Sequence, residues 1–418
     1  MKNVIAVLLC LTILCGCTAA PAPVSTPEVP PAPQSAPPQS VSPEPVTPTP
    51  EVTPEPEPDP IGEQLALLTT EEKVGQLLLA GIDGLTAGED AVYAVQTLRV
   101  GSIILFRRNV DTCAQAAALV TELKALNGDH IPLFIAMDEE GGPVSRMPAD
   151  ITDLPSACTY GKTGDEELCF RLGQALAAQC AAIGVNVDFA PVADIWSNPS
   201  NTVIGKRAFG TDADSVSALM LQAARGLSSS GVIPVVKHFP GHGDTETDSH
   251  YDLPVVTKTL EELENLELKP FRAAVEAGLP AVMVAHLLLT QVDDTRPATL
   301  SPAVVTGLLR EELGFDGVVF TDDLTMGAIS NTYGMGEAAI LAFEAGCDVL
   351  LVCHKRDNLT AAYTALLEAV SSGRIPEARL DESVRRILTL KAEYGLTNEP
   401  VSEPDPQALN GLLAAALP

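Results

Sequence analysis

Short, uniformly apolar segments recur along the chain between residues 76 and 353. Each is apolar along its whole length, as expected for strands that are buried on both faces of a sheet. Eight segments have this character: QLLLAGI near residue 76, GSIILF near 101, PLFIAMD near 132, NVDFAPV near 186, VIPVVKHF near 232, PAVMVAH near 280, GVVFTD near 317 and DVLLVC near 348.

Longer amphipathic segments separate these strands and predict helices. They span residues 112–127, 165–183, 212–230, 260–277, 301–313, 336–345 and 358–372, and most are followed by a glycine where the helix should end. Eight strand–helix units in about 330 residues predict an α/β fold, a closed parallel (β/α)8 or TIM barrel. An open, doubly wound sheet is the alternative. No GxGxxG motif follows the first strand, so a dinucleotide site is not expected.

The N-terminal residues have the pattern of an export signal. Lys2 precedes an apolar run, residues 4–14, which is too short to span a membrane as a mature helix. The run ends in Leu14-Cys15-Gly16-Cys17, which resembles the bacterial lipobox, whose last cysteine is lipidated after cleavage. We therefore expect a lipoprotein signal peptide at residues 1–17 and a lipid on Cys17. This lipid would anchor the protein to the outer, extracytoplasmic face of a bacterial cell membrane. Plain secretion with cleavage nearby is the alternative.

A proline-rich stretch follows the signal. Residues 18–60 contain 16 of the 34 prolines of the chain, together with many Glu, Thr and Ser residues. Such sequence favours solvated, extended polyproline II and builds no core. We expect residues 18–60 to be a disordered linker, residues 61–397 to form the barrel, and residues 398–418 to form a C-terminal tail.

The charge and the cysteines exclude several kinds of partner. A formal net charge of −30 disfavours nucleic acid and anionic lipid, so the anchor is the only membrane contact expected. Three cysteines belong to the signal. The other six form no CxxC or Cys/His metal pattern, and we expect no metal site and mostly buried free thiols. These six are Cys113, Cys158, Cys169, Cys180, Cys347 and Cys353.

Polar residues gather at the ends of five predicted strands. In a parallel barrel the C-terminal strand ends meet at one face, where catalytic residues collect. Buried charge is costly unless it is paired, so five polar strand ends predict a functional site there. These ends carry Asp138-Glu139-Glu140-Gly141-Gly142, Asp194, Lys237-His238 with the following PGHGD stretch, His286, and Thr321-Asp322-Asp323.

Two of these places carry the groups that glycoside cleavage requires. A glycosidase needs a carboxylate against the anomeric carbon and a proton donor at the leaving oxygen. Asp322 or Asp323 can supply the first. The stretch GHGDTETDSH can supply the second, because Asp248 and His250 are close enough in sequence to hydrogen-bond in a turn. Such a partner fixes the tautomer of an imidazole.

The stretches KHFPGHGDTETDSH and GVVFTDDLTM together resemble glycoside hydrolase family 3, and most closely its single-domain β-N-acetylhexosaminidase branch. The resemblance runs from about Ile61 to Gly395. It implies a retaining exo-β-N-acetylglucosaminidase that acts through a covalent glycosyl-aspartate. Its substrates would be peptidoglycan-derived or chitin-like oligosaccharides with terminal N-acetylglucosamine. It implies neither cofactor nor metal.

The same resemblance implies roles for single residues. Asp322 matches the nucleophile of the family, His250 the acid/base and Asp248 the partner of that histidine. The sugar-binding positions of the family match Asp138, Arg146, Arg207, Lys237 and His238. One position departs from the pattern: the family commonly has arginine directly after D-x-E-G-G, and Pro143 stands there. This change affects contacts at the rim and leaves the catalytic pair intact.

Other residues and other functions stay open. We expect supporting roles for some neighbours: Asp323 to orient a residue or cap a helix, His242 and Asp244 to shape a loop, Asp194 to hold the rim, Trp196 to pack, and His286 either to line the site or to support it. A phosphorylase is possible because a neutral histidine base lets phosphate replace water. A non-catalytic solute-binding lipoprotein would need neither nucleophile nor proton donor. We expect a monomer that binds an N-acetylglucosamine-containing oligosaccharide.

Overall fold

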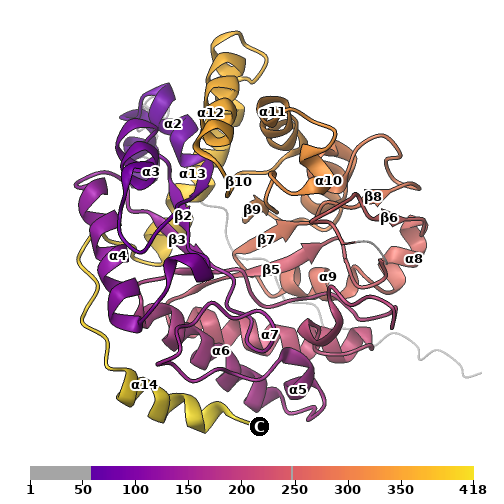
Figure 1. Cartoon of the computed structure of the whole chain (residues 1–418). Helices are drawn as coiled ribbons and strands as arrows, with labels where there is room; N and C mark the ends of the chain where they lie inside the picture. Colours follow the sequence, from indigo (N-terminus) through magenta and orange to yellow (C-terminus); the bar gives the residue numbers. More distant parts are fainter. Residues whose placement is uncertain (1–57, 246–247) are drawn as a thin grey trace, which may run out of the picture. The chain divides into compact units, whose positions relative to one another are not determined.

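Eight parallel strands form a ring at the centre of the structure, a computed structural model that describes residues 58–245 and 248–418 (Figure 1). The strands are β1 (Leu78–Gly81), β2 (Ser102–Ile104), β3 (Phe134–Met137), β4 (Val187–Asp188), β5 (Ile233–Phe239), β7 (Ala281–Val284), β9 (Val318–Thr321) and β10 (Leu350–Val352). They pair in the order β10-β1-β2-β3-β4-β5-β7-β9. A parallel bridge between Phe320 and Val349 completes the ring. The ring confirms the predicted (β/α)8 barrel and excludes the open sheet.

Each strand lies within one of the eight predicted apolar segments. The reason is burial: every residue of β3, β5, β7 and β9 is buried. Phe134 of β3 and Phe320 of β9 belong to strands that are not neighbours in the ring, yet their ring centroids are 6.2 Å apart. Phe189 packs edge-on against Phe320 at 5.6 Å. These aromatic side chains therefore help to fill the interior of the barrel, which is a packed core in parallel barrels.

Helices surround the ring (Figure 1). They are α1 (Pro60–Ala66), α2 (Thr70–Gln76), α3 (Glu89–Val92), α4 (Cys113–Asn127), α5 (Ala157–Gly161), α6 (Glu166–Ala182), α7 (Ala213–Ser229), α8 (Leu260–Asn265), α9 (Lys269–Glu276), α10 (Gly327–Ser330), α11 (Met335–Ala345), α12 (Arg356–Ser371), α13 (Glu377–Glu393) and α14 (Pro406–Leu413). Segments of 3-10 or π geometry are η1 (Tyr93–Thr97), η2 (Arg107–Asn109), η3 (Gly205–Arg207), η4 (Ala298–Leu300), η5 (Ala303–Glu312) and η6 (Ala414–Ala416). Strands β6 (Val255–Val256) and β8 (Leu288–Leu289) pair outside the barrel.

Two boundaries differ from the sequence prediction, and proline explains both. The helix predicted over 260–277 is two helices, because Pro270 has no N–H to continue a helix and instead stands at the start of α9. Pro60, which we placed in the linker, is the first residue of α1, a position that favours proline. Asp59 caps this helix and pairs with Arg385 at 3.0 Å. The predicted signal peptide, Cys17 and linker residues 18–57 lie outside the described residues.

The C-terminal tail and the cysteines belong to the packed part of the chain. Helix α14 and the turn η6 that follows it lie against α6, and Leu413 of α14 and Ala416 of η6 are buried. The six described cysteines are free thiols, and all except Cys158 are buried. This confirms the expectation of mostly buried, unpaired thiols.

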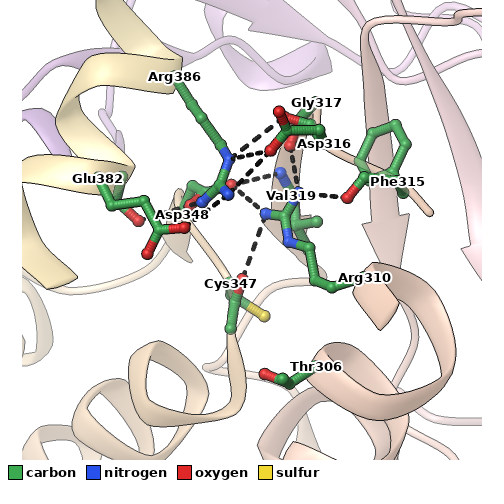
Figure 2. Close-up of polar contacts among 12 residues, drawn as sticks. Thr306, Arg310, Phe315, Asp316, Gly317, Val319, Cys347, Asp348, Glu382 and Arg386 are labelled. Carbon is green, nitrogen blue, oxygen red and sulfur yellow. Dashed lines mark hydrogen bonds and ion pairs between the residues drawn. The ribbon is translucent and has the colours of Figure 1, made fainter. Parts of the chain in front are cut away.

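A buried carboxylate ties the outer helices to the barrel (Figure 2). Asp348, which is fully buried just before β10, accepts a hydrogen bond of 2.5 Å from Arg310 of η5. The backbone N–H of Val319 in β9 donates to the same carboxylate, and so does the hydroxyl of Ser383 in α13. Arg386 of α13 lies 3.5 Å away. A buried charge is tolerated only when it is paired and hydrogen-bonded in this way, so the cluster fixes α13 and η5 against two strands.

Candidate active site

A cavity of about 370 Å³ opens at the C-terminal ends of the barrel strands. Seven of the eight residues predicted to form the site line it: Asp138, Arg146, Arg207, Lys237, His238, His250 and Asp322. Asp248 does not line it and instead lies behind His250. The strand ends predicted this place for Asp138, Lys237, His238 and Asp322, and the family resemblance predicted it for Arg146 and Arg207. The roles of these residues remain predictions.

An ion-pair network links β3 to β5 on one side of the cavity. Lys237 is buried, and its Nζ lies 2.8 Å from Asp138 Oδ1 and 2.7 Å from Glu140 Oε1. Burial alone would lower the pKa of Lys237, but these two carboxylates raise it above its usual value. Arg146 lies 3.5 Å from the other oxygen of Asp138. Arg146 Nε is buried and has no hydrogen-bond partner among the described residues, and the Arg146 side chain lines the cavity.

Arg207 and His238 form the next part of the wall. Arg207 donates two hydrogen bonds to Glu140, at 2.7 and 2.8 Å, in a bidentate pair. His238 Nδ1 lies 2.6 Å from the buried Asp194, and its Nε2 lies 3.2 Å from Arg207. Since a guanidinium can only donate, Nε2 accepts and Nδ1 carries the proton. Asp194 thus fixes the tautomer and the orientation of His238.

The turn after β3 carries Arg146 back toward Asp138. Glu139 is buried and accepts hydrogen bonds from the Arg146 N–H and the Ser145 hydroxyl, at 2.7 and 3.0 Å. Burial raises the pKa of Glu139 to about 7. Gly142 has φ +61°, and a Cβ there would lie 2.5 Å from the Cβ of Ser156, so only glycine fits. This local need explains the paired glycines of the motif.

The two aspartates after β9 have different surroundings. Asp323 accepts three hydrogen bonds, from the Thr325 N–H and hydroxyl and from the Cys353 N–H. Asp322 accepts one from a described residue, the N–H of Asp323. Burial alone would raise the pKa of Asp322, but the charge of His286 and this hydrogen bond hold it below its usual value. Asp322 is therefore an ionised carboxylate facing the cavity, and Asp323 shapes the turn.

His286 supports this turn from behind. It is fully buried at the end of β7 and does not line the cavity. Its Nε2 lies 3.0 Å from the carbonyl oxygen of Asp323, and its Nδ1 lies 2.7 Å from the hydroxyl of Thr299. The structure therefore favours a supporting role for His286 over a role in lining the site.

The loop after β5 brings His250 to the mouth of the cavity. Its Nδ1 lies 2.7 Å from Asp248 Oδ1, and its side chain is 64% exposed. Burial would raise the pKa of Asp248, but the N–H and ring of His250 lower it below its usual value. The carbonyls of Ser249 and His250 accept hydrogen bonds from Ala328 and Gly327, directly after the Asp322 turn. The loop that carries His250 and the segment after Asp322 are thus held together by backbone hydrogen bonds.

The residues around the cavity include every group that glycoside cleavage needs. An ionised carboxylate, an imidazole with a fixed tautomer and several cationic donors surround one sugar-sized space. Within residues 58–245 and 248–418, no group of three or more His, Cys, Asp or Glu side chains is arranged to hold a metal ion.

A known protein family matches this chain over nearly the whole barrel. Residues 69–390 match the glycosyl hydrolase family 3 N-terminal domain. The chain belongs to glycoside hydrolase family 3. The resemblance seen in the KHFPGHGDTETDSH and GVVFTDDLTM stretches is thereby confirmed.

Individual family 3 proteins are similar over most of their length. A beta-hexosaminidase of Neisseria meningitidis serogroup C is 40% identical over 289 residues, which are 67% of this chain and 79% of the relative. A family 3 β-N-acetylglucosaminidase from Paenibacillus sp. FPU-7 is 45% identical with a TM-score of 0.79, and the match covers 84% of this chain and 68% of that one. NagZ from Neisseria gonorrhoeae, in complex with N-trifluoroacetyl-D-glucosamine, is 35% identical with a TM-score of 0.68, covering 81% and 96%.

Sequence reasoning left out several residues of this family 3 site. Glu140 was given no role, yet it holds both Arg207 and Lys237. Phe106 and His354 also line the cavity, with stacked rings 5.7 Å apart. Both stand at the ends of predicted strands, so the rule that identified the other strand ends could have found them.

Proposed function

We propose that this family 3 protein is a retaining exo-β-N-acetylglucosaminidase that removes terminal β-linked N-acetylglucosamine from oligosaccharides. One observation carries the proposal: the ionised Asp322 and the Asp248-bound His250 line or border the same cavity. The relatives named beta-hexosaminidase and β-N-acetylglucosaminidase support the choice of sugar.

The first half of the reaction forms an ester. The free oxygen of Asp322 attacks the anomeric carbon as the bond to the leaving oxygen breaks. The protonated ring of His250 gives its proton to that oxygen, so the leaving group departs as an alcohol. Asp248 stabilises the cationic ring before the transfer. Arg146 and Lys237, which both line the cavity, donate to sugar hydroxyls.

The second half restores the enzyme. The now neutral His250 takes a proton from water, which attacks the anomeric carbon from the side the leaving group vacated. The bond to Asp322 breaks, and the carboxylate returns. Two inversions give net retention of configuration. Because a neutral base does not repel an anion, phosphate is the natural competitor of water at this step.

Product analysis tests this proposal. With N,N′-diacetylchitobiose the enzyme should release N-acetylglucosamine whose first-formed anomer is β, as followed by NMR. Adding phosphate should leave this product unchanged. N-acetylglucosamine 1-phosphate as the main product would identify a phosphorylase instead. Binding of the disaccharide without turnover would identify a solute-binding protein.

We also propose that a lipid on Cys17 holds the enzyme at the outer face of a bacterial membrane. The lipobox-like quartet ending in Cys17 and the proline-rich stretch after it support this location. A Cys17→Ala variant should move from the membrane pellet to the soluble fraction. Its activity should be retained, since the change lies outside the barrel. If the variant stays in the pellet after a salt wash, the anchor is not at Cys17.

A further inference from the structure

A second cavity, of about 540 Å³, adjoins the sugar cavity. His250, Arg207, Val144 and Val203 line both cavities, so the two are continuous. The other walls of the second cavity are largely apolar and include Pro143 and Trp196. We call this space the outer groove.

The position of His250 shows which neighbouring space receives the leaving group. A general acid must lie within hydrogen-bond reach of the oxygen that it protonates. The leaving group therefore begins at His250 and extends away from the sugar cavity. A third cavity, of about 350 Å³, meets the sugar cavity at Cys353 and His354, but His250 does not line it. The outer groove is thus the space on the side of the proton donor.

Trp196 presents a fixed aromatic surface in this groove. It is half-buried, and its indole N–H donates a 3.1 Å hydrogen bond to the carbonyl of Asn201. Its backbone N–H donates to the carbonyl of Gly210 at 3.0 Å. A ring whose polar edge is already bound offers its apolar face to a ligand, and sugar rings have an apolar C–H face that packs on such surfaces.

Most charged groups that line the groove are paired within the protein, and Lys206 is the exception. The guanidinium of Arg207 is bound by Glu140, and Asp248 adds a carboxylate. Lys206 is exposed, and it forms no ion pair with a described residue. Pro143 stands where the family commonly has arginine, so the near rim has no cation at that position.

We propose that the outer groove is the leaving-side subsite and that it takes a second, uncharged N-acetylglucosamine ring stacked on Trp196. This inference rests on the proposed glycosidase function and adds the substrate class to it: chitin-like oligomers are preferred over disaccharides with an anionic muramic acid on the leaving side.

The test compares a substrate that fills the groove with one that does not. Trp196→Ala should lower kcat/KM on N,N′-diacetylchitobiose by roughly 5- to 100-fold, the range for loss of stacking on an aromatic ring. Hydrolysis of N-acetyl-β-glucosaminyl fluoride should change far less, because fluoride leaves without entering the groove. Trp196→Phe, which keeps an aromatic face, should retain most activity on the disaccharide.

Hydrolysis of the fluoride is the necessary control, because the segment after Trp196 also holds the loop that carries His250. Asn201 donates to the carbonyl of His242 at 2.8 Å, and Asn198 donates to that of Asp244 at 3.2 Å. An equal loss on the fluoride and the disaccharide would make Trp196 a support of this loop and overturn the subsite. If the wild-type enzyme hydrolyses neither substrate, the proposed function itself fails.

A charge swap tests the ligand class. The wild-type enzyme should cleave chitobiose faster than N-acetylglucosaminyl-N-acetylmuramic acid. Pro143→Arg should shift this ratio toward the muramic acid substrate, with hydrolysis of the fluoride as the control. The opposite wild-type preference, if Lys206→Ala abolishes it, would show that the groove selects an anionic leaving group through Lys206 and would overturn the proposal.

Discussion

Replacing Asp322 with asparagine should lower kcat on N,N′-diacetylchitobiose by on the order of 10⁴–10⁶-fold, the scale of losing a covalent nucleophile. The amide keeps the shape of the side chain and its hydrogen bond from Asp323, but it cannot form the ester. Substrate binding should change little, because the cationic donors of the cavity remain. Steady-state kinetics together with calorimetric binding of N-acetylglucosamine separate these two effects.

Asp323→Asn is the matched control. Its carboxylate holds the Thr325 and Cys353 backbone, and an amide oxygen can still accept part of this set. The loss should therefore be far smaller than for Asp322→Asn. If the two variants reverse this order, Asp323 is the nucleophile and the assignment made here is wrong.

The effect of His250→Ala should depend on the leaving group. An alkoxide from a second sugar must be protonated as it departs, whereas a dinitrophenolate is stable enough to leave unaided. Activity on the disaccharide should thus fall about 10²–10⁴-fold further than activity on the dinitrophenyl glycoside, which is the usual contribution of general acid catalysis. Parallel kinetics on the two substrates measure this gap.

The same variant should also be slow in the second step, because water has lost its base. With the dinitrophenyl glycoside the glycosyl-enzyme should accumulate, and azide should accelerate its breakdown. Asp248→Asn should fall between the wild type and His250→Ala, since it only weakens the support of the ring. An equal loss on both substrates would assign His250 to binding. His242 is a poor replacement, because burial and His238 lower its pKa to about 4.

The fold could be predicted because burial on both faces leaves a clear pattern. Every residue of β3 and β7 is buried and the sequence there is apolar throughout, and the eight predicted segments match the eight barrel strands. The break between α8 and α9 was missed, although Pro270 marks it. Amphipathic spacing continues through the break because each helix buries apolar residues, Leu263 in α8 and Phe271 in α9.

The site could be predicted in part. Strand ends and the DSH motif located its main groups, since topology alone brings the C-terminal ends of parallel strands together. The partnership of Glu140 with Arg207 could not be read from the sequence, because the residues are 67 positions apart and only the turn geometry aligns them. The outer groove could not be predicted from the sequence either, because Pro143 and Trp196 follow different strands.

The central claim is that Asp322 forms a covalent bond to the sugar. A fluorinated N-acetylglucosaminyl substrate that slows the second step should trap this intermediate, and the digested protein can be analysed by mass spectrometry. The expected result is a peptide that carries one sugar, with fragment ions that place it on Asp322. A sugar on Asp323 would contradict this assignment, and turnover of the substrate with no covalent adduct would contradict the glycosyl-aspartate mechanism.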